Sequence, residues 1–166
     1  MRVESRTLMT IAAISALAVT TSAPGATAAP GGQRGGSPVG VWATQLDFGD
    51  GQTVHVWQQY TAQGVLCHEV RAEGVPHGMS EGTWRKTGPG RFRYAVTELF
   101  RDETGQVHGR AELSGTAVLA GREFDSSHSS KVYDADGRLV ASGTENITFS
   151  RVTRAVPPCE VPPVEP

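Results

Sequence analysis

Three ionisable residues of this chain, Glu98, His128 and Glu145, could do chemistry inside an apolar core. Each shares, by the two-residue repeat of an extended strand, a face with apolar residues. Two carboxylates and an imidazole that converge there could orient the polar group of a ligand, or act as acid and base. Buried charges are costly unless they are paired or serve a ligand. The alternative is a one-residue register shift or a bulge that turns one or more of the three outward.

Aromatic residues on the predicted strands would form the apolar walls of such a site. The candidate ligand-binding residues are Glu98, His128, Glu145, Tyr94, Trp57 and Phe92, with Trp42 and Phe100 as further wall residues. The other histidines, His55, His68, His77 and His108, are expected on the surface.

Other kinds of site find little support. No nucleophile elbow, zinc-protease motif, phosphate-binding loop, dinucleotide fingerprint or Cys-x-x-Cys pair is present, so we expect no catalytic motif, metal or cofactor. The histidines show no metal-ligand spacing. Residues 30–166 hold 13 basic and 16 acidic residues, a net charge of −3, and contain no basic block. Nucleic acid is therefore not an expected partner.

The first 29 residues read as a secretory signal peptide. Arg2 and Arg6 precede the uncharged apolar run 11–19, and small residues offer cleavage after Ala28 or Ala29. A membrane anchor is the rival interpretation, but polar and turn residues at 20–25 interrupt the apolar run well before the ~20 residues that a span needs. We therefore expect a secreted protein with no membrane anchor.

Two cysteines, Cys67 and Cys159, are predicted to form one disulfide because exported thiols tend to oxidise. Ninety-one residues lie between them. Two free thiols are the alternative.

Between a glycine-rich arm, residues 30–38, and a proline-rich acidic tail, residues 155–166, glycine-containing turns recur every 12 to 16 residues. Seven turns delimit eight segments that are rich in β-branched and aromatic residues and alternate apolar with polar positions. One inward face, for example, carries Leu139, Ala141, Ile147 and Phe149.

Such a series predicts an all-β domain over residues 39–154, an eight-stranded antiparallel up-and-down barrel. Closure removes the two free edges that an open sheet would expose. A β-sandwich is the alternative.

At the start of the first predicted strand, Gly40-Val41-Trp42 forms a Gly-x-Trp element, and Arg151 ends the last strand. The pattern resembles the lipocalin-like, or calycin, barrels over residues 38–154. That resemblance implies that Trp42 closes the barrel floor and that Arg151 stacks on it. A disulfide between barrel and tail is also lipocalin-like. The chain departs from the family by lacking a helix after the last strand and by its short barrel; streptavidin-like barrels match its length, but their biotin-contacting residues have no counterpart here.

Three functions follow from a secreted barrel. The first is a binding protein that holds a small apolar or amphipathic molecule. The second is a barrel cyclase or isomerase in which His128 and a carboxylate act as acid and base. The third is a structural or interaction protein whose barrel is filled by its own side chains. Ligand identity and oligomeric state do not follow from the sequence.

Overall fold

The computed structural model describes residues 36–47, 53–72, 78–101 and 104–153. The strands are β1 (Gly40–Asp47), β2 (Thr53–Tyr60), β3 (Val65–Ala72), β4 (Gly78–Gly88), β5 (Arg91–Arg101), β6 (Val107–Ala120), β7 (Glu123–Asp134) and β8 (Leu139–Val152). The predicted signal peptide, most of the predicted arm and the predicted tail lie outside the described residues.

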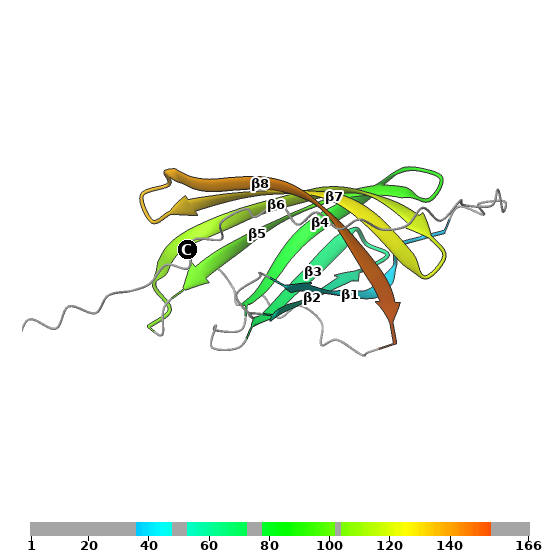
Figure 1. Ribbon diagram of the computed structural model, residues 1–166, viewed down its shortest axis with the longest axis horizontal. Coiled ribbons are helices and arrows are strands. Elements are labelled where there is room, and N and C mark those ends of the chain that lie inside the picture. Colours follow the sequence, from blue (N-terminus) through cyan, green and yellow to red (C-terminus); the bar gives the residue numbers. More distant parts are fainter. Residues whose placement is uncertain (1–35, 48–52, 73–77, 102–103, 154–166) are drawn as a thin grey trace, which may run out of the picture.

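The eight strands form one closed antiparallel barrel in which each strand pairs with the next and β8 pairs with β1 (Figure 1). The predicted up-and-down barrel is confirmed, and the sandwich alternative is wrong. No helix in the described part of the chain is long and apolar enough to cross a membrane.

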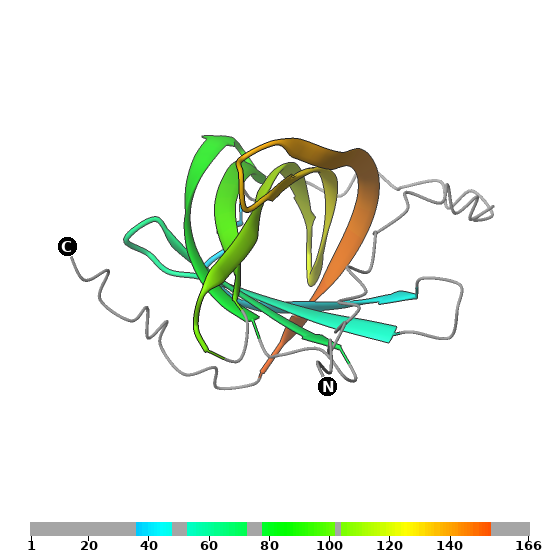
Figure 2. The same cartoon turned by 90° about the vertical axis from the view of Figure 1, so that its left-hand side faces the viewer.

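The barrel is closed at one end and parts at the other. β1 pairs with β8 only through Val41–Ala43. β4 pairs with β5 only from Gly82 onward, so residues 78–81 pair with β3 alone and residues 97–101 with β6 alone. Two half-shells result, β1–β4 and β5–β8, joined at the closed end and separated at the open end. Figure 2 looks toward the open end and shows the second half-shell arching over β1 to β3.

The closed end is filled by aromatic side chains in edge and stacked contacts, with ring centroids 4.8 to 6.3 Å apart. This aromatic cluster consists of Trp42, Tyr60, Trp84, Phe92, Phe124 and Phe149. Both indoles are satisfied, because Trp42 Nε1 donates to the Pro38 carbonyl at 2.6 Å and Trp84 Nε1 to the Thr61 carbonyl at 2.8 Å. Aromatic burial with satisfied donors is a strong source of stability.

Arg151 covers the outer side of Trp42. Its guanidinium lies 4.7 Å from the centre of the Trp42 ring and donates to the carbonyls of Ser37 and Val39 at 3.2 and 2.9 Å. A cation over an indole face is an attractive arrangement. Arg151 therefore holds the first described residues of the chain against the closed end.

One predicted inward residue is wrong because of a bulge. The β7–β8 register shifts between Val132 and Tyr133, so Leu139 pairs with Tyr133 and Ala141 with Val132. The extra residue, Val140, reverses the alternation at the start of β8. Leu139 and Val140 are 55 % and 58 % exposed at the tip of the hairpin.

Candidate functional site

A row of side chains crosses the second half-shell at mid-height. Tyr94, Gly115, His128 and Glu145 are successive cross-strand partners on β5, β6, β7 and β8. Directly opposed residues in an antiparallel pair lie on the same face. Since Tyr94 and His128 are buried inside the barrel, Glu145 also points inward.

Gly115 makes room for the Tyr94 ring. A Cβ atom at position 115 would collide with the end of that ring, including its hydroxyl. Without a side chain there, the ring lies across β6 and reaches β7. A glycine inside a strand often marks such a close approach.

The Tyr94 hydroxyl connects two residues of β7. It lies 2.9 Å from Ser126 Oγ and 3.0 Å from His128 Nδ1. No described residue hydrogen-bonds to Nε2 of His128, so that nitrogen remains for a ligand, as donor or acceptor according to the tautomer.

The facing wall, in the first half-shell, carries a second chain of hydrogen bonds. The Tyr60 hydroxyl donates to Gln58 Oε1 at 2.6 Å, and Gln58 Nε2 lies 3.3 Å from His68 Nδ1. Because an amide nitrogen can only donate, His68 Nδ1 accepts and the hydrogen of the neutral ring lies on Nε2. Together with Tyr94, Ser126 and His128, these residues form the interior polar cluster.

The interior polar cluster is uncharged at neutral pH. Burial, and repulsion from the His128 ring when that ring is protonated, lower the pKa of His68 to about 4. Burial also lowers the pKa of His128 and raises the pKa of the Tyr60 and Tyr94 phenols. Loss of hydration disfavours the charged form of each group.

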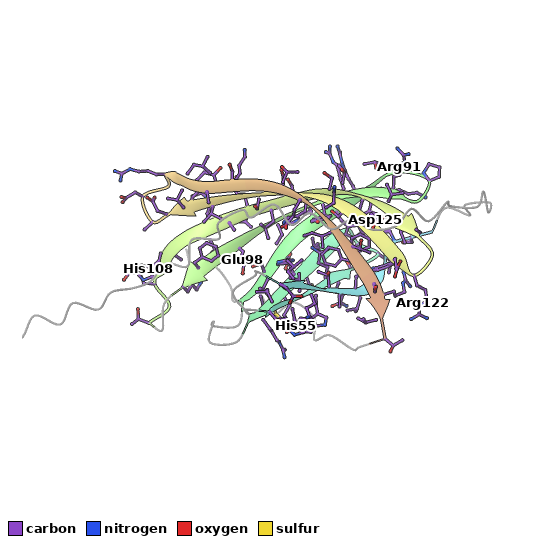
Figure 3. All side chains as sticks on the ribbon, in the orientation of Figure 1. His55, Arg91, Glu98, His108, Arg122 and Asp125 are labelled. Carbon is purple, nitrogen blue, oxygen red and sulfur yellow. The ribbon has the colours of Figure 1, made fainter. Side chains whose placement is uncertain are left out.

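Two carboxylates lie on inward-facing positions nearer the open end. Glu98, on β5, is half-buried, and Figure 3 shows it on the side of β5 that faces the first half-shell. Glu145 is exposed by surface area, yet incomplete hydration raises the pKa of both carboxyl groups. After burial, which is the main cause, the charge of Glu145 also raises the pKa of the Tyr94 phenol.

The predicted site residues therefore do not all lie together. Tyr94, His128 and Glu145 come together in one row, and Glu98 lies above them toward the open end. Phe100 is 36 % exposed at the mouth.

The assignment of Trp57 to the interior is wrong. It lies on the outer face of β2, stacked on His55 at 5.7 Å, with the Arg71 guanidinium 5.4 Å from its ring. Its position in the alternation is the reason, since Val56 and Gln58 on either side are buried. Phe92 packs into the closed-end cluster, and its place there leaves it below the polar residues.

The expectation that His68 is a surface histidine is also wrong, because only 4 % of it is exposed. The alternation of β3 in the sequence could have indicated this, because it places His68 on the same face as Leu66 and Val70. Gln58 was missed for the same reason, as a polar residue between the inward Val56 and Tyr60. Ser126 shows no such signal, since serine is common on both faces of a strand.

A second candidate surface lies outside the barrel. A groove of about 610 Å³ crosses the outer face of β4 to β7, and its lining includes Glu81, Thr97, Glu112 and Lys131. Its walls are mixed in charge and open to solvent, unlike the polar cluster inside.

No group of three or more potential metal ligands occurs among the described residues. They contain no free cysteine, and Cys67 is buried on β3. Cys159 lies outside them, so its pairing with Cys67 stays a prediction.

Comparison of the chain with protein-family models, with curated proteins and with solved structures finds no match.

Proposed function

We propose that this protein is a lipocalin-like binding protein that holds a small, partly apolar molecule between its two half-shells. The observation that carries the proposal is the interior polar cluster at the level where the half-shells part. Its two imidazole rings each keep a nitrogen that no described residue binds. Neither nitrogen is among the fully buried side-chain atoms of the described residues that lack a partner, so both can be reached by a ligand.

The open end supports a ligand with an apolar portion. Above the cluster, the inward positions of β5 and β6 carry Val96, Leu113 and Ala111, and Phe100 stands at the mouth. Sites for small molecules commonly combine such apolar walls with a few placed polar groups.

Binding of N-phenyl-1-naphthylamine, a neutral apolar fluorophore, tests the proposal. Its fluorescence should rise on titration with the protein and saturate at one molecule per chain. Tyr94→Phe keeps the ring and removes the hydroxyl, so the affinity should fall about two- to tenfold, the contribution of one hydrogen bond.

Glu81→Gln, in the outer groove, is the matched control and should leave the affinity unchanged. Absence of a saturable signal would overturn the proposal. So would an affinity that falls in Glu81→Gln and not in Tyr94→Phe, because the probe would then occupy the outer groove.

A second candidate function is acid–base catalysis, which the 3.0 Å contact between the Tyr94 hydroxyl and the neutral His128 imidazole favours. Such a pair can transfer a proton at a carbon next to a carbonyl. An enzyme of this kind should exchange the α-hydrogens of 2-decanone for deuterium faster than its His128→Gln variant, as followed by NMR. Equal exchange rates in the two proteins would leave binding alone.

We also propose that the protein is exported and that its signal peptide is removed by cleavage after Ala28 or Ala29. The basic start, apolar run and small residues of the sequence support this. The intact mass of the protein recovered from the medium should correspond to a chain beginning at residue 29 or 30. A full-length mass, or retention in the cell, would contradict export.

A further inference from the structure

The outer face of β5 to β8, which Figure 1 shows side by side in one layer, carries a row of side chains near the open end. Leu99, Arg110, Tyr133 and Leu139 are successive cross-strand partners, one on each strand. Because directly opposed residues share a face, the four side chains form one continuous row. Leu99 and Leu139 are 45 % and 55 % exposed, and Val140, next in the chain, is 58 % exposed. Apolar side chains that gather on one face mark an interaction surface, whereas singly scattered ones do not.

The centre of this row is held in place before any partner binds. The Arg110 guanidinium lies 4.2 Å from the centre of the Tyr133 ring. Glu112, in the next row, accepts from Arg110 Nε at 3.3 Å and from the Tyr133 hydroxyl at 3.2 Å. Tyrosine and arginine are among the residue types that most often anchor protein interfaces. Anchors that are already ordered lose less conformational freedom when a partner binds.

Two further rows of exposed residues continue this face toward the closed end. In order from β5 to β8, the second row consists of Thr97, Glu112, Lys131 and Ser142. The third row has only short side chains, with Ser114 and Ser129 at its centre. The groove of about 610 Å³ crosses both rows. Because the third row holds no long side chain, another surface can approach the strands closely there.

The first row is complementary to its own reverse. A two-fold axis parallel to the strands, between β6 and β7, would bring a second copy face to face and reverse the order of each row. Leu99 would then face Leu139 of the second copy, and Arg110 would face Tyr133. An apolar pair would lie at each end of the row, and a cation would lie against an aromatic ring on each side of the axis. Such a surface is self-complementary, as a two-fold interface must be.

The other two rows are complementary under the same reversal. Glu112 would face Lys131 of the second copy, so each dimer would gain two contacts between opposite charges. Ser114 would face Ser129, which keeps the third row free of bulky overlap. A partner of one charge would instead meet either Glu112 or Lys131 as a like charge, and a purely apolar partner would offer neither an opposite charge. A second copy therefore fits this face best.

We infer that the outer face of β5 to β8 binds a second copy of this chain in a two-fold dimer. The inference does not rest on the proposed binding function, because this face lies outside the barrel interior. Three rows of four residues are fewer than the ~20–30 residues that each partner contributes to an interface of standard size. The dimer should therefore be reversible, and its population should depend on protein concentration.

Sedimentation equilibrium of the protein over a range of concentrations tests the inference. Lys131→Glu and Glu112→Lys should each weaken dimerisation at least about tenfold, because each places two like-charged contacts in the dimer. An equimolar mixture of the two variants should dimerise again, since every facing pair would then have opposite charges. Leu139→Ser should also weaken dimerisation about tenfold, through loss of apolar contact at both ends of the row.

Met79→Ser is the matched control. It removes a 36 % exposed apolar side chain from β4, outside the three rows, and should leave the dimerisation constant unchanged. Circular dichroism checks that each variant retains its β-sheet.

A protein that stays monomeric at every concentration overturns the inference. So does a dimer of equal strength in the wild type, Lys131→Glu and Leu139→Ser, because it would form through another surface. Charge variants that weaken the dimer separately and fail to restore it when mixed would contradict the facing of Glu112 with Lys131, and with it the two-fold axis.

Discussion

The two ends of this barrel have different interiors. At the closed end, pairing of β1 with β8 and of β4 with β5 completes the wall, and aromatic rings fill the space. Toward the open end both of these pairings stop, and polar and acidic side chains occupy inward positions. One end is therefore built for stability, and the other carries groups that a purely structural core would replace with apolar residues.

The same division appears in the hydrogen bonds. The polar atoms of the aromatic cluster are used to fasten the structure, as where Trp42 Nε1 binds the Pro38 carbonyl. In the interior polar cluster, each histidine uses one nitrogen for the fold and leaves the other unbonded to any described residue. Mutations at the closed end should therefore mainly lower the stability of the fold, and mutations in the interior polar cluster should mainly lower the affinity for a ligand.

Trp42→Ala should cause the largest loss of stability. The side chain is fully buried against Phe124 and beneath Arg151, and truncation of a large buried aromatic residue costs about 3–5 kcal/mol. Denaturant unfolding followed by circular dichroism measures this loss. A loss below about 1 kcal/mol for Trp42→Ala would show that the closed end is not the stabilising core.

His128→Gln, by contrast, should change the free energy of unfolding by less than about 1 kcal/mol, because a polar side chain remains near Tyr94.

The predicted disulfide would tie the residues after β8 to the outer side of β3. Thiol titration of the denatured, unreduced protein should find no free thiol, and two titratable thiols would refute the pairing. Replacement of both cysteines by serine should cost about 2–4 kcal/mol, as loss of a long-range disulfide usually does. Affinity for N-phenyl-1-naphthylamine should not change, because Cys67 lies outside the barrel interior.

Gly115→Ala should damage the site more than the fold. The new methyl group would overlap the end of the Tyr94 ring, which must move away from Ser126 and His128. Such overpacking costs about 1–3 kcal/mol. Loss of fluorophore binding with the β-sheet spectrum retained is the expected result, and unchanged affinity would mean that the position of the Tyr94 hydroxyl is irrelevant to binding.

The pH dependence of stability should carry a contribution from His68. The pKa of His68 is about 4 in the folded protein against 6.5 for a free imidazole. Between these two pH values the unfolded chain binds a proton at this ring and the folded chain does not. This contribution is complete above pH 6.5 and is lost as the pH falls toward 4, by at most about 1.4 kcal/mol per pH unit.

Glu98 and Glu145 act in the opposite sense. Their raised pKa values mean that the folded state binds protons more readily than the unfolded state, so acidification favours folding through these two groups.

Comparison of the wild type with His68→Asn isolates the contribution of the histidine, since the asparagine side chain can still accept a hydrogen bond from Gln58. The difference in stability between wild type and variant should move against the wild type below pH 6.5, and a constant difference would contradict burial of a neutral His68.

The strand content and closure of the barrel could be predicted from the sequence because turns and alternation are local signals. The same alternation identified Glu98, His128 and Glu145 as inward positions, and the register across β5 to β8 gives them that orientation. It failed at Leu139, where a bulge adds one residue, and nothing in the local sequence marks that bulge.

Which residues meet across the interior could not be predicted. The approach of Tyr94 to His128 depends on Gly115 lying between them, a fact of register between three strands. The parting of the half-shells depends on where pairing of β1 with β8 and of β4 with β5 stops, which no single segment specifies. Trp57 was misplaced because its type suggested a wall of a site, although the parity of Val56 and Gln58 turns it outward.

The most direct test of an accessible polar cluster inside the barrel is NMR of the histidine side chains, first across pH and then with N-phenyl-1-naphthylamine added. His68 and His128 should titrate below pH ~6.5, the value of a model imidazole. Their ring resonances should shift on addition of N-phenyl-1-naphthylamine, while those of His55, on the outer face beside Trp57, should not. Titration of His128 near pH ~6.5, together with ring resonances that do not shift when the fluorophore is added, would contradict an accessible site and leave a barrel filled only by its own side chains.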